Sequence, residues 1–239
     1  MNLKKNSELK HNMKWTVVDN KKETPIANTV TFHPERKVAF KAGQWFLLSA
    51  FIDGKKVKRA YSASSSPGED YIKITSKLSQ KPTFSKLLFD IKPGDFLDVE
   101  GPFGKFTYES GDGDELSLIG GGSGIAPLMS IVHYVIEEGL DVPITVIYSS
   151  KSEDLIIFKD EFTRIAAQHP HIKVHFTLTQ ELWEGLNGRI SGTMIKELIP
   201  HLRESTYYLC GPPQMVNSIQ QELIELGVPA IQIRTERYN

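Results

Sequence analysis

Cysteine is almost absent from this sequence, which contains one, Cys210. A single thiol cannot form an internal disulfide, and it cannot supply the four thiolates that hold an iron–sulfur cluster. The lack of disulfides fits a reducing compartment, so we expect a cytoplasmic protein. The seven histidines do not follow the spacing of a metal site, and we expect no bound metal.

Excess charge of either sign and long apolar runs are also lacking. The formal net charge is -1, so no overall field attracts nucleic acid or an anionic membrane. No stretch approaches the ~20 apolar residues of a membrane helix. The start, Met1 to Lys14, is polar and does not resemble a secretory signal. We therefore expect neither nucleic-acid binding nor a membrane span.

The 239 residues, 40% apolar and 24% charged, suffice for two globular domains. The pattern changes near residue 110, which predicts one domain over residues 13–110 and a second over 111–239. The polar, glycine-containing residues 109–115 are the expected linker.

The first half consists of short apolar or alternating runs separated by turn residues, which predicts an antiparallel sandwich or barrel. Phe84, Leu87, Leu88 and Ile91 recur at helical spacing and predict one short helix. In the second half, strands alternate with helical stripes, which predicts a doubly wound parallel sheet. The expected strands of that sheet are residues 116–120, 144–148, 173–178, 207–210 and 230–233, with helices including 154–167.

A glycine-rich turn joins the first strand and first helix of the second half. Gly122, Ser123 and Gly124 allow a close approach of backbone, and the following helix directs free N–H groups at the same space. This arrangement suits a pyrophosphate at the carboxyl ends of the strands. Pro127 replaces the third glycine of the usual fingerprint, and a purely structural tight turn is the alternative.

Ser150 and Lys151 follow the next strand. An NAD site usually places an acid there, whereas hydroxyls and a cation suit the 2′-phosphate of NADP. We therefore favour NADPH over NADH, with a solvated loop as the alternative for Lys151.

Arg59, Tyr61 and Ser62 stand close together in the first half. On a strand, Arg59 and Tyr61 share one face about 7 Å apart, where they could hold a phosphate and an aromatic ring system. A serine-rich surface turn is the competing explanation.

Arg59-Ala60-Tyr61-Ser62 resembles the flavin motif of the ferredoxin–NADP reductase family. Residues 101–106, 120–127 and 210–215 resemble, in the same order, the turn that ends that family's flavin domain, its glycine loop and its Cys-Gly-Pro-Pro-x-Met signature. Any one motif could arise by chance, but the ordered set of four is highly specific.

The resemblance implies that Arg59 binds the FAD diphosphate, that Tyr61 stacks on the isoalloxazine and that Ser62 bonds near N5. The rest of FAD would be held by two further segments. Pro82 stands about where the family has glycine, so FMN remains the minor alternative. The residues implied in these two segments are Ile74, Thr75, Lys77, Thr83, Phe84 and Ser85.

On the nicotinamide side, the resemblance implies that Gly122, Ser123 and Gly124 cradle the diphosphate. Cys210, Gly211 and Pro212 would position the nicotinamide, and Arg189 is a further expected contact. Glu236 and Tyr238 in the tail would lie near the flavin, unless the terminus is frayed. The expected catalytic residues are Tyr61, Ser62, Cys210 and Glu236.

We therefore predict an FAD-dependent oxidoreductase in which NAD(P)H gives a hydride to flavin N5 and electrons pass to a separate acceptor. A ferredoxin, a flavodoxin, a cytochrome, an oxygenase component or a small molecule would serve. The alternatives are an electron-transfer subunit of a larger complex and a flavin-binding module without hydride transfer.

Overall fold

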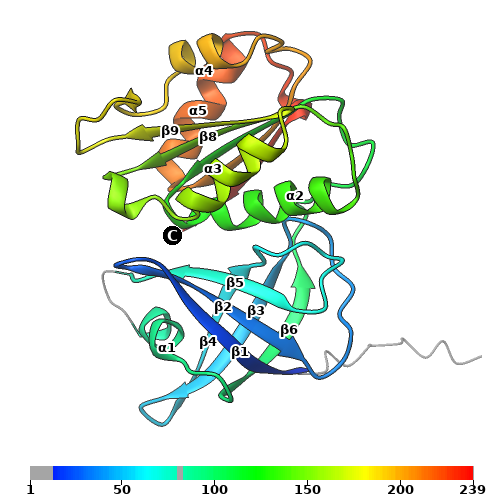
Figure 1. Ribbon diagram of the computed structural model, residues 1–239, viewed down its shortest axis with the longest axis vertical. Helices are drawn as coiled ribbons and strands as arrows, with labels where there is room; N and C mark the ends of the chain where they lie inside the picture. Colours follow the sequence, from blue (N-terminus) through cyan, green and yellow to red (C-terminus); the bar gives the residue numbers. More distant parts are fainter. Residues whose placement is uncertain (1–12, 80–82, 239) are drawn as a thin grey trace, which may run out of the picture.

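The structure is a computed structural model that describes residues 13–79 and 83–238. The expectations for residues 1–12 and for Pro82 lie outside this part. Two six-stranded sheets form two bodies, one above the other in Figure 1.

The first sheet is antiparallel, with strand order β4-β3-β6-β1-β2-β5. A bridge between Ala63 and Ile74 joins its two edges and closes it into a barrel. In β1 the inward residues Met13, Trp15 and Val17 alternate with exposed ones, as a half-buried strand requires. The elements are β1 (Met13–Thr24), β2 (Ala27–Pro34), β3 (Trp45–Ile52), β4 (Lys55–Ser62), β5 (Ile72–Lys77), α1 (Phe84–Asp90) and β6 (Phe96–Phe103).

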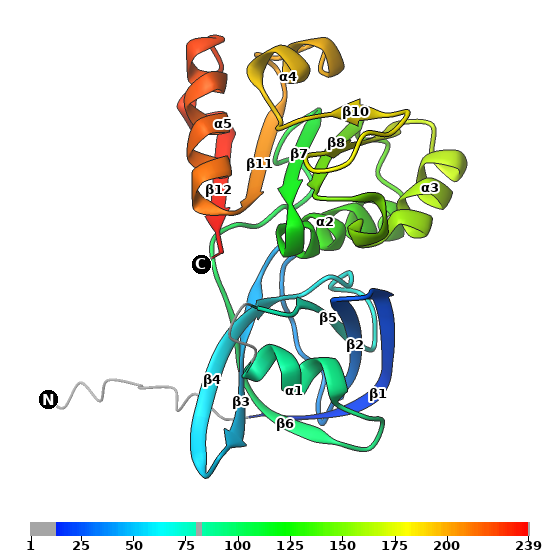
Figure 2. The ribbon, with the colours of Figure 1, turned by 90° about the vertical axis from the view of Figure 1, so that its left-hand side faces the viewer.

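The second sheet is parallel, with strand order β10-β9-β8-β7-β11-β12. Figure 2 shows α2 and α3 on one face and α4 and α5 on the other. Its strands are β7 (Leu116–Gly121), β8 (Ile144–Ser150), β9 (Ile172–Leu178), β10 (Leu186–Asn187), β11 (Thr206–Gly211) and β12 (Ile233–Arg237). Its helices are α2 (Ile125–Glu137), α3 (Lys159–Gln168), α4 (Gly192–Leu198) and α5 (Pro213–Glu225), with short 3₁₀ turns at Gly122–Gly124, Glu153–Leu155 and Ala230–Gln232.

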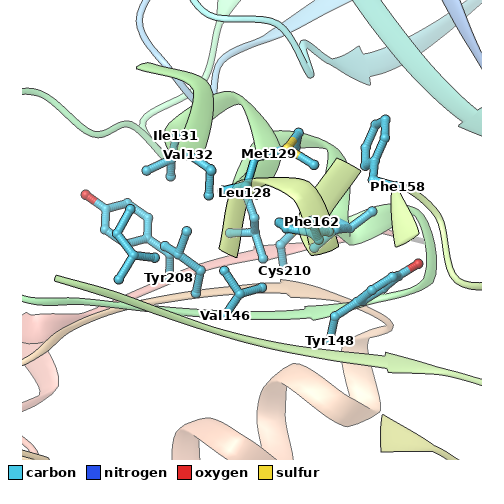
Figure 3. Close-up of a cluster of buried hydrophobic side chains, with 14 of the residues drawn as sticks. Leu128, Met129, Ile131, Val132, Val146, Tyr148, Phe158, Phe162, Tyr208 and Cys210 are labelled. Carbon is cyan, nitrogen blue, oxygen red and sulfur yellow. The ribbon is translucent and has the colours of Figure 1, made fainter. Parts of the chain in front are cut away.

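An apolar core fixes α2 against this sheet (Figure 3). Leu128, Met129 and Val132 of α2 face Val146 and Tyr148 of β8, and all five are fully buried. The Tyr148 hydroxyl donates a hydrogen bond to the carbonyl oxygen of Gly122 at 2.9 Å. The packing therefore holds the glycine turn at the carboxyl end of β7.

The fold class expected from the sequence, an antiparallel barrel followed by a doubly wound parallel sheet, is confirmed. Two element boundaries of the second half differ, and one strand was not expected. The helix expected from Asp154 begins at Lys159 because Phe158 adopts a left-handed φ of 63° with its side chain buried. The last strand begins at Ile233, after a 3₁₀ turn that follows Pro229. The two-residue β10 was too short to produce a periodic signal.

Candidate active site

A cleft of about 370 Å³ lies between β4, β5, α1 and the start of α2. The alternation of β4 places Arg59 and Tyr61 on one side of the strand, at this cleft. Most of the residues expected to hold the flavin meet here, but Ile74 does not, because its side chain is buried in the barrel core. The lining residues are Arg59, Ala60, Tyr61, Ser62, Thr75, Ser76, Lys77, Ser79, Thr83, Phe84, Ser85, Ser123, Ala126 and Tyr238.

Tyr61 presents an aromatic surface to the cleft. Its ring lies 6.0 Å from the Phe84 ring, centroid to centroid, with 33° between the planes. Burial raises the pKa of Tyr61 to about 12, despite the opposing charge of Arg59. The side chain is therefore a neutral, largely apolar ring, suited to stacking against another ring system.

A second cleft of about 330 Å³ opens at the carboxyl ends of the parallel strands. It brings together Gly122, Ser150, Lys151, Arg189 and Pro212, which the sequence singled out separately. No side chain caps the 3₁₀ turn Gly122–Gly124 that leads into α2, so the N–H groups of this turn have no side-chain partner and can meet an anion. The full lining is Lys77, Gly121, Gly122, Ser149, Ser150, Lys151, Thr179, Arg189, Ile190, Pro212, Gln214, Met215 and Ser218.

Gly124 and Gly211 lie behind this cleft and allow β7 and β11 to meet closely. A Cβ at Gly124 would collide with the backbone of Cys210, and Gly211 has a φ of 153° beside Gly121. Their contribution is close backbone packing at the turn.

Lys77 lines both clefts. Burial, and then the charge of Lys151, lower the pKa of Lys77. Within residues 13–79 and 83–238, no carboxylate lies within salt-bridge distance of its ammonium. A half-buried cation without such a counterion is a site for an anionic ligand.

The first cleft reaches the chain's tail, since Tyr238 lines it. Strand β12 pairs with β11, placing Glu236 opposite Cys210, so the terminus up to Tyr238 is not frayed. The Tyr238 and Ser62 hydroxyl oxygens lie 2.5 Å apart. Burial raises the pKa of the Cys210 thiol, and the Glu236 carboxylate raises it further.

Glu236 is the carboxylic acid at this end of the chain. Burial raises its pKa to about 7. Its Oε2 atom is buried and has no hydrogen-bond partner among the residues described. The carboxyl group can therefore exist protonated or ionised near neutral pH.

A third cavity, of about 240 Å³, adjoins this point and is lined by Trp45, Ala60, Tyr61, Ser62, Glu236, Arg237 and Tyr238. Sequence reasoning missed Trp45, which lies opposite Ser62 in the β3–β4 register and contacts the Phe103 ring, 4.8 Å away. It also missed Thr179, Gln214 and Met215 in the dinucleotide cleft. Met215 stands in the quoted Cys-Gly-Pro-Pro-x-Met signature, which could have identified it.

The comparisons with known proteins agree with this geometry. Residues 16–108 match the oxidoreductase FAD-binding domain, and residues 118–221 match the oxidoreductase NAD-binding domain. NADH-cytochrome b5 reductase 1 of Eremothecium gossypii is 32% identical over 77% of this chain and 68% of its own length. The plasma membrane-associated coenzyme Q6 reductase of Saccharomyces cerevisiae is 30% identical over 90% of this chain and 72% of its own length.

Among solved structures, a ferredoxin NADP⁺ reductase from Neisseria gonorrhoeae with bound FAD and NADP superposes with a TM-score of 0.83 at 24% identity, covering 96% of this chain and 99% of that one. The chain spans between 64% and 68% of the length of several cytochrome b5 reductases that it matches.

A barrel with a flavin-type cleft, followed by a parallel sheet with a dinucleotide-type cleft, defines a two-domain flavin-dependent oxidoreductase. The chain belongs to the ferredoxin–NADP reductase family, which also contains the cytochrome b5 reductases. Its cofactor is FAD. The side chains of the first cleft fit this cofactor, because Arg59 and Lys77 can bind a diphosphate and Tyr61 can stack on a ring system.

The described residues lack both a membrane-spanning helix and a cluster of metal ligands. None of their helices is long and apolar enough to cross a membrane. They contain no group of three or more His, Cys, Asp or Glu side chains that could hold a metal ion.

Proposed function

We propose that this chain catalyses hydride transfer from NAD(P)H to FAD and delivers the electrons to a separate acceptor. The observation that carries the proposal is that the two clefts share Lys77, while Ser62 and Tyr238 meet in the flavin-type cleft. Bound FAD supplies the chemistry, accepting two electrons as a hydride and releasing them singly or together. The chain contributes binding, alignment and control of protons.

The residue roles follow from the contacts. Arg59 and Lys77 bind phosphate oxygens, and Tyr61 stacks on the flavin ring system. Ser62 and Tyr238 hold the ring end through their hydroxyl groups. Glu236, with its pKa of about 7, stores a proton beside them. Thr75, Thr83 and Ser85 supply hydroxyl donors, while Phe84 supports the Tyr61 ring.

The domain bounds 13–110 and 111–239 remain part of this proposal, with residues 109–115 as the linker. Cytoplasmic location also remains a proposal, supported by the single buried thiol. One relative is named as plasma membrane-associated, so fractionation of cells that express the protein is the test.

The dinucleotide cleft favours NADPH on electrostatic grounds. Lys77, Lys151 and Arg189 line it, whereas the nearby acids Glu153 and Asp154 do not. Several relatives are named as NADH-dependent, so we propose that NADH is also accepted and that the 2′-phosphate adds affinity through Lys151.

The Lys151→Gln substitution tests this coenzyme assignment. Loss of one charge-assisted hydrogen bond, worth about 1.5 kcal/mol, should raise the KM for NADPH about tenfold and leave the KM for NADH nearly unchanged. Steady-state assays with both donors and a nonphysiological acceptor give the comparison. Lys159→Gln, outside the cleft, is the matched control. Equal effects of Lys151→Gln on both donors would show that Lys151 does not bind a 2′-phosphate.

The central claim is tested by the visible spectrum of the purified chain under anaerobic conditions. We expect flavin absorption bands that bleach when NADPH or NADH is added. A protein that binds neither FAD nor FMN would refute the proposal. A yellow protein bleached by neither donor would support the module without hydride transfer, and bleaching without onward transfer to any acceptor would support the role of a subunit.

The acceptor is proposed to approach at the cavity beside Trp45. That cavity is lined by Tyr61 and Ser62 together with the aromatic residues Trp45 and Tyr238, whereas Arg59 and Lys77 do not line it. The relatives' names specify cytochrome b5 and coenzyme Q6, so a b-type cytochrome and a quinone are the first acceptors to compare with ferredoxin and flavodoxin. If the protein reduced ferredoxin faster than both the cytochrome and the quinone, this assignment of the acceptor would be wrong.

A further inference from the structure

Helix α2 is bonded at two points to the loop that follows β4. The Ser130 hydroxyl donates to the carbonyl oxygen of Ser65 at 2.7 Å. One turn along the same helix face, Nδ1 of His133 lies 3.0 Å from the carbonyl oxygen of Ser64. Ser64 and Ser65 are both buried. The helix that begins at the glycine turn is thus attached to the segment that carries the flavin motif.

The other ring nitrogen of His133 contacts a third element. Its Nε2 atom lies 2.9 Å from Oε1 of Glu161 on α3. A carbonyl oxygen and an ionised carboxylate can only accept hydrogen bonds, so both ring nitrogens must donate. The contact geometry therefore requires the imidazolium form of His133, as long as Glu161 is ionised.

Glu161 is held in its ionised form. Burial acts to raise the pKa of Glu161, but the hydrogen bond and charge of His133 outweigh burial, and the pKa lies below its usual value. Lys21 on β1 and Lys73 at β5 add to this effect, and Arg164 on α3 lies 3.9 Å from the carboxylate. The surrounding elements also carry the charged residues Lys22, Glu23, Glu69, Glu137, Lys159 and Asp160.

We propose that His133, as an imidazolium paired with Glu161, is a positioning residue that sets the spacing between the flavin cleft and the dinucleotide cleft. The proposal rests on the function proposed above. His133 touches neither cleft, and it acts through Ser64, two residues after Ser62.

His133 holds two acceptors at once, the Ser64 carbonyl oxygen and the Glu161 carboxylate. A side chain that can donate only one hydrogen bond at this position leaves one acceptor unsatisfied, and α2 is then held less firmly against the loop. Loss of the doubly donating ring should therefore slow flavin reduction, although His133 touches neither cleft.

The protonation state can be measured directly by NMR of the protein labelled with ¹⁵N-histidine, with the His133→Gln variant used to assign the signal. We expect both ring nitrogens of His133 to be protonated at neutral pH. In Glu161→Gln, the side-chain amide can donate to Nε2, so the neutral ring should satisfy both contacts. A neutral ring in the unchanged protein would overturn the proposal.

The positioning role is measured in the holoenzyme by stopped-flow flavin reduction. His133→Gln should lower the rate constant about tenfold, as expected for loss of one charge-assisted hydrogen bond. The dissociation constant of NAD(P)H should change less than about twofold, since His133 contacts no ligand. Glu161→Gln should retain the rate, because its amide lets a neutral ring keep both contacts, and the control Arg164→Gln should retain it as well.

Hydrogen exchange of residues 63–68 provides a readout without turnover, since faster exchange is expected in His133→Gln than in the unchanged protein. An unaltered rate constant and unaltered exchange in His133→Gln would sink the proposal. If the unchanged protein is not bleached by either donor, the proposed function fails instead, and the NMR and exchange results still report on the pair.

Discussion

At the scale of single residues, Glu236 has the consequence that is simplest to measure. Its ordinary pKa of 4.5 rises to about 7 through burial, so the folded protein binds more protons than the unfolded chain between these values. The contribution of this group to stability is therefore present at low pH and is lost as the pH rises toward 7 and above. Glu236→Gln should remove this loss, stabilising the protein at pH 8 by about 1–2 kcal/mol after allowance for solvent screening.

Urea unfolding at pH 5 and pH 8 measures the effect. The exposed Glu225 on α5 supplies the control, and Glu225→Gln should shift stability equally at both pH values. If Glu236→Gln changed the free energy of unfolding by the same amount at pH 5 and pH 8, the carboxyl group would not be titrating in this range.

At the scale of elements, the glycine turn separates two reasons for using glycine. Gly124 has an ordinary φ of -62°, but a Cβ would collide with the backbone of Cys210. Gly122 has a left-handed φ of 56°, with Lys77 Nζ 3.9 Å away as the nearest atom to an added Cβ. Gly124→Ala should push the glycine turn away from β11, costing about 1–3 kcal/mol and weakening NAD(P)H binding.

Gly122→Ala is the matched variant, and it should cost about 1–2 kcal/mol for the backbone conformation alone while β7 and β11 stay in place. Chemical unfolding and titration with NAD(P)H measure both variants. If the two substitutions weakened NAD(P)H binding equally, displacement of the turn from β11 would not be the cause of the weaker binding.

Elements also show what the sequence can predict. The Arg59–Ser62 motif and the glycine turn were found because each is local, its residues adjacent on one strand or turn. Trp45 was missed because its proximity to Ser62 depends on the β3–β4 register. The role of His133 was not predicted because Ser64 and Glu161 lie 69 and 28 residues away in sequence. The left-handed Phe158 delays the start of α3, which periodicity alone placed at Asp154.

At the scale of the whole molecule, Arg234 links the two halves. Its guanidinium donates to the Thr107 carbonyl oxygen at 2.6 Å, to Asp112 at 2.9 Å and to the Tyr208 hydroxyl at 2.6 Å. The hydrogen bond from Arg234 lowers the pKa of Asp112, so this pair stabilises the fold above the ordinary carboxyl range and loses its effect as the pH falls. The last strand thus holds the segment between the sheets.

Arg234→Gln should cost about 2 kcal/mol, because it removes the charged donor and leaves Asp112 with the Glu109 N–H and the Thr107 carbonyl oxygen with the Tyr208 hydroxyl. It should also uncouple the halves, so that release of flavin fluorescence, which reports on the barrel, occurs at a lower temperature than loss of helical circular dichroism. Asp112→Asn removes the charge pair but leaves the bond to Thr107, so it should lower stability less and keep the two transitions together. Coincident transitions in Arg234→Gln would mean that the other contacts between the halves are enough to make them unfold together. These contacts include the bonds from Ser130 and His133 to the flavin-motif loop.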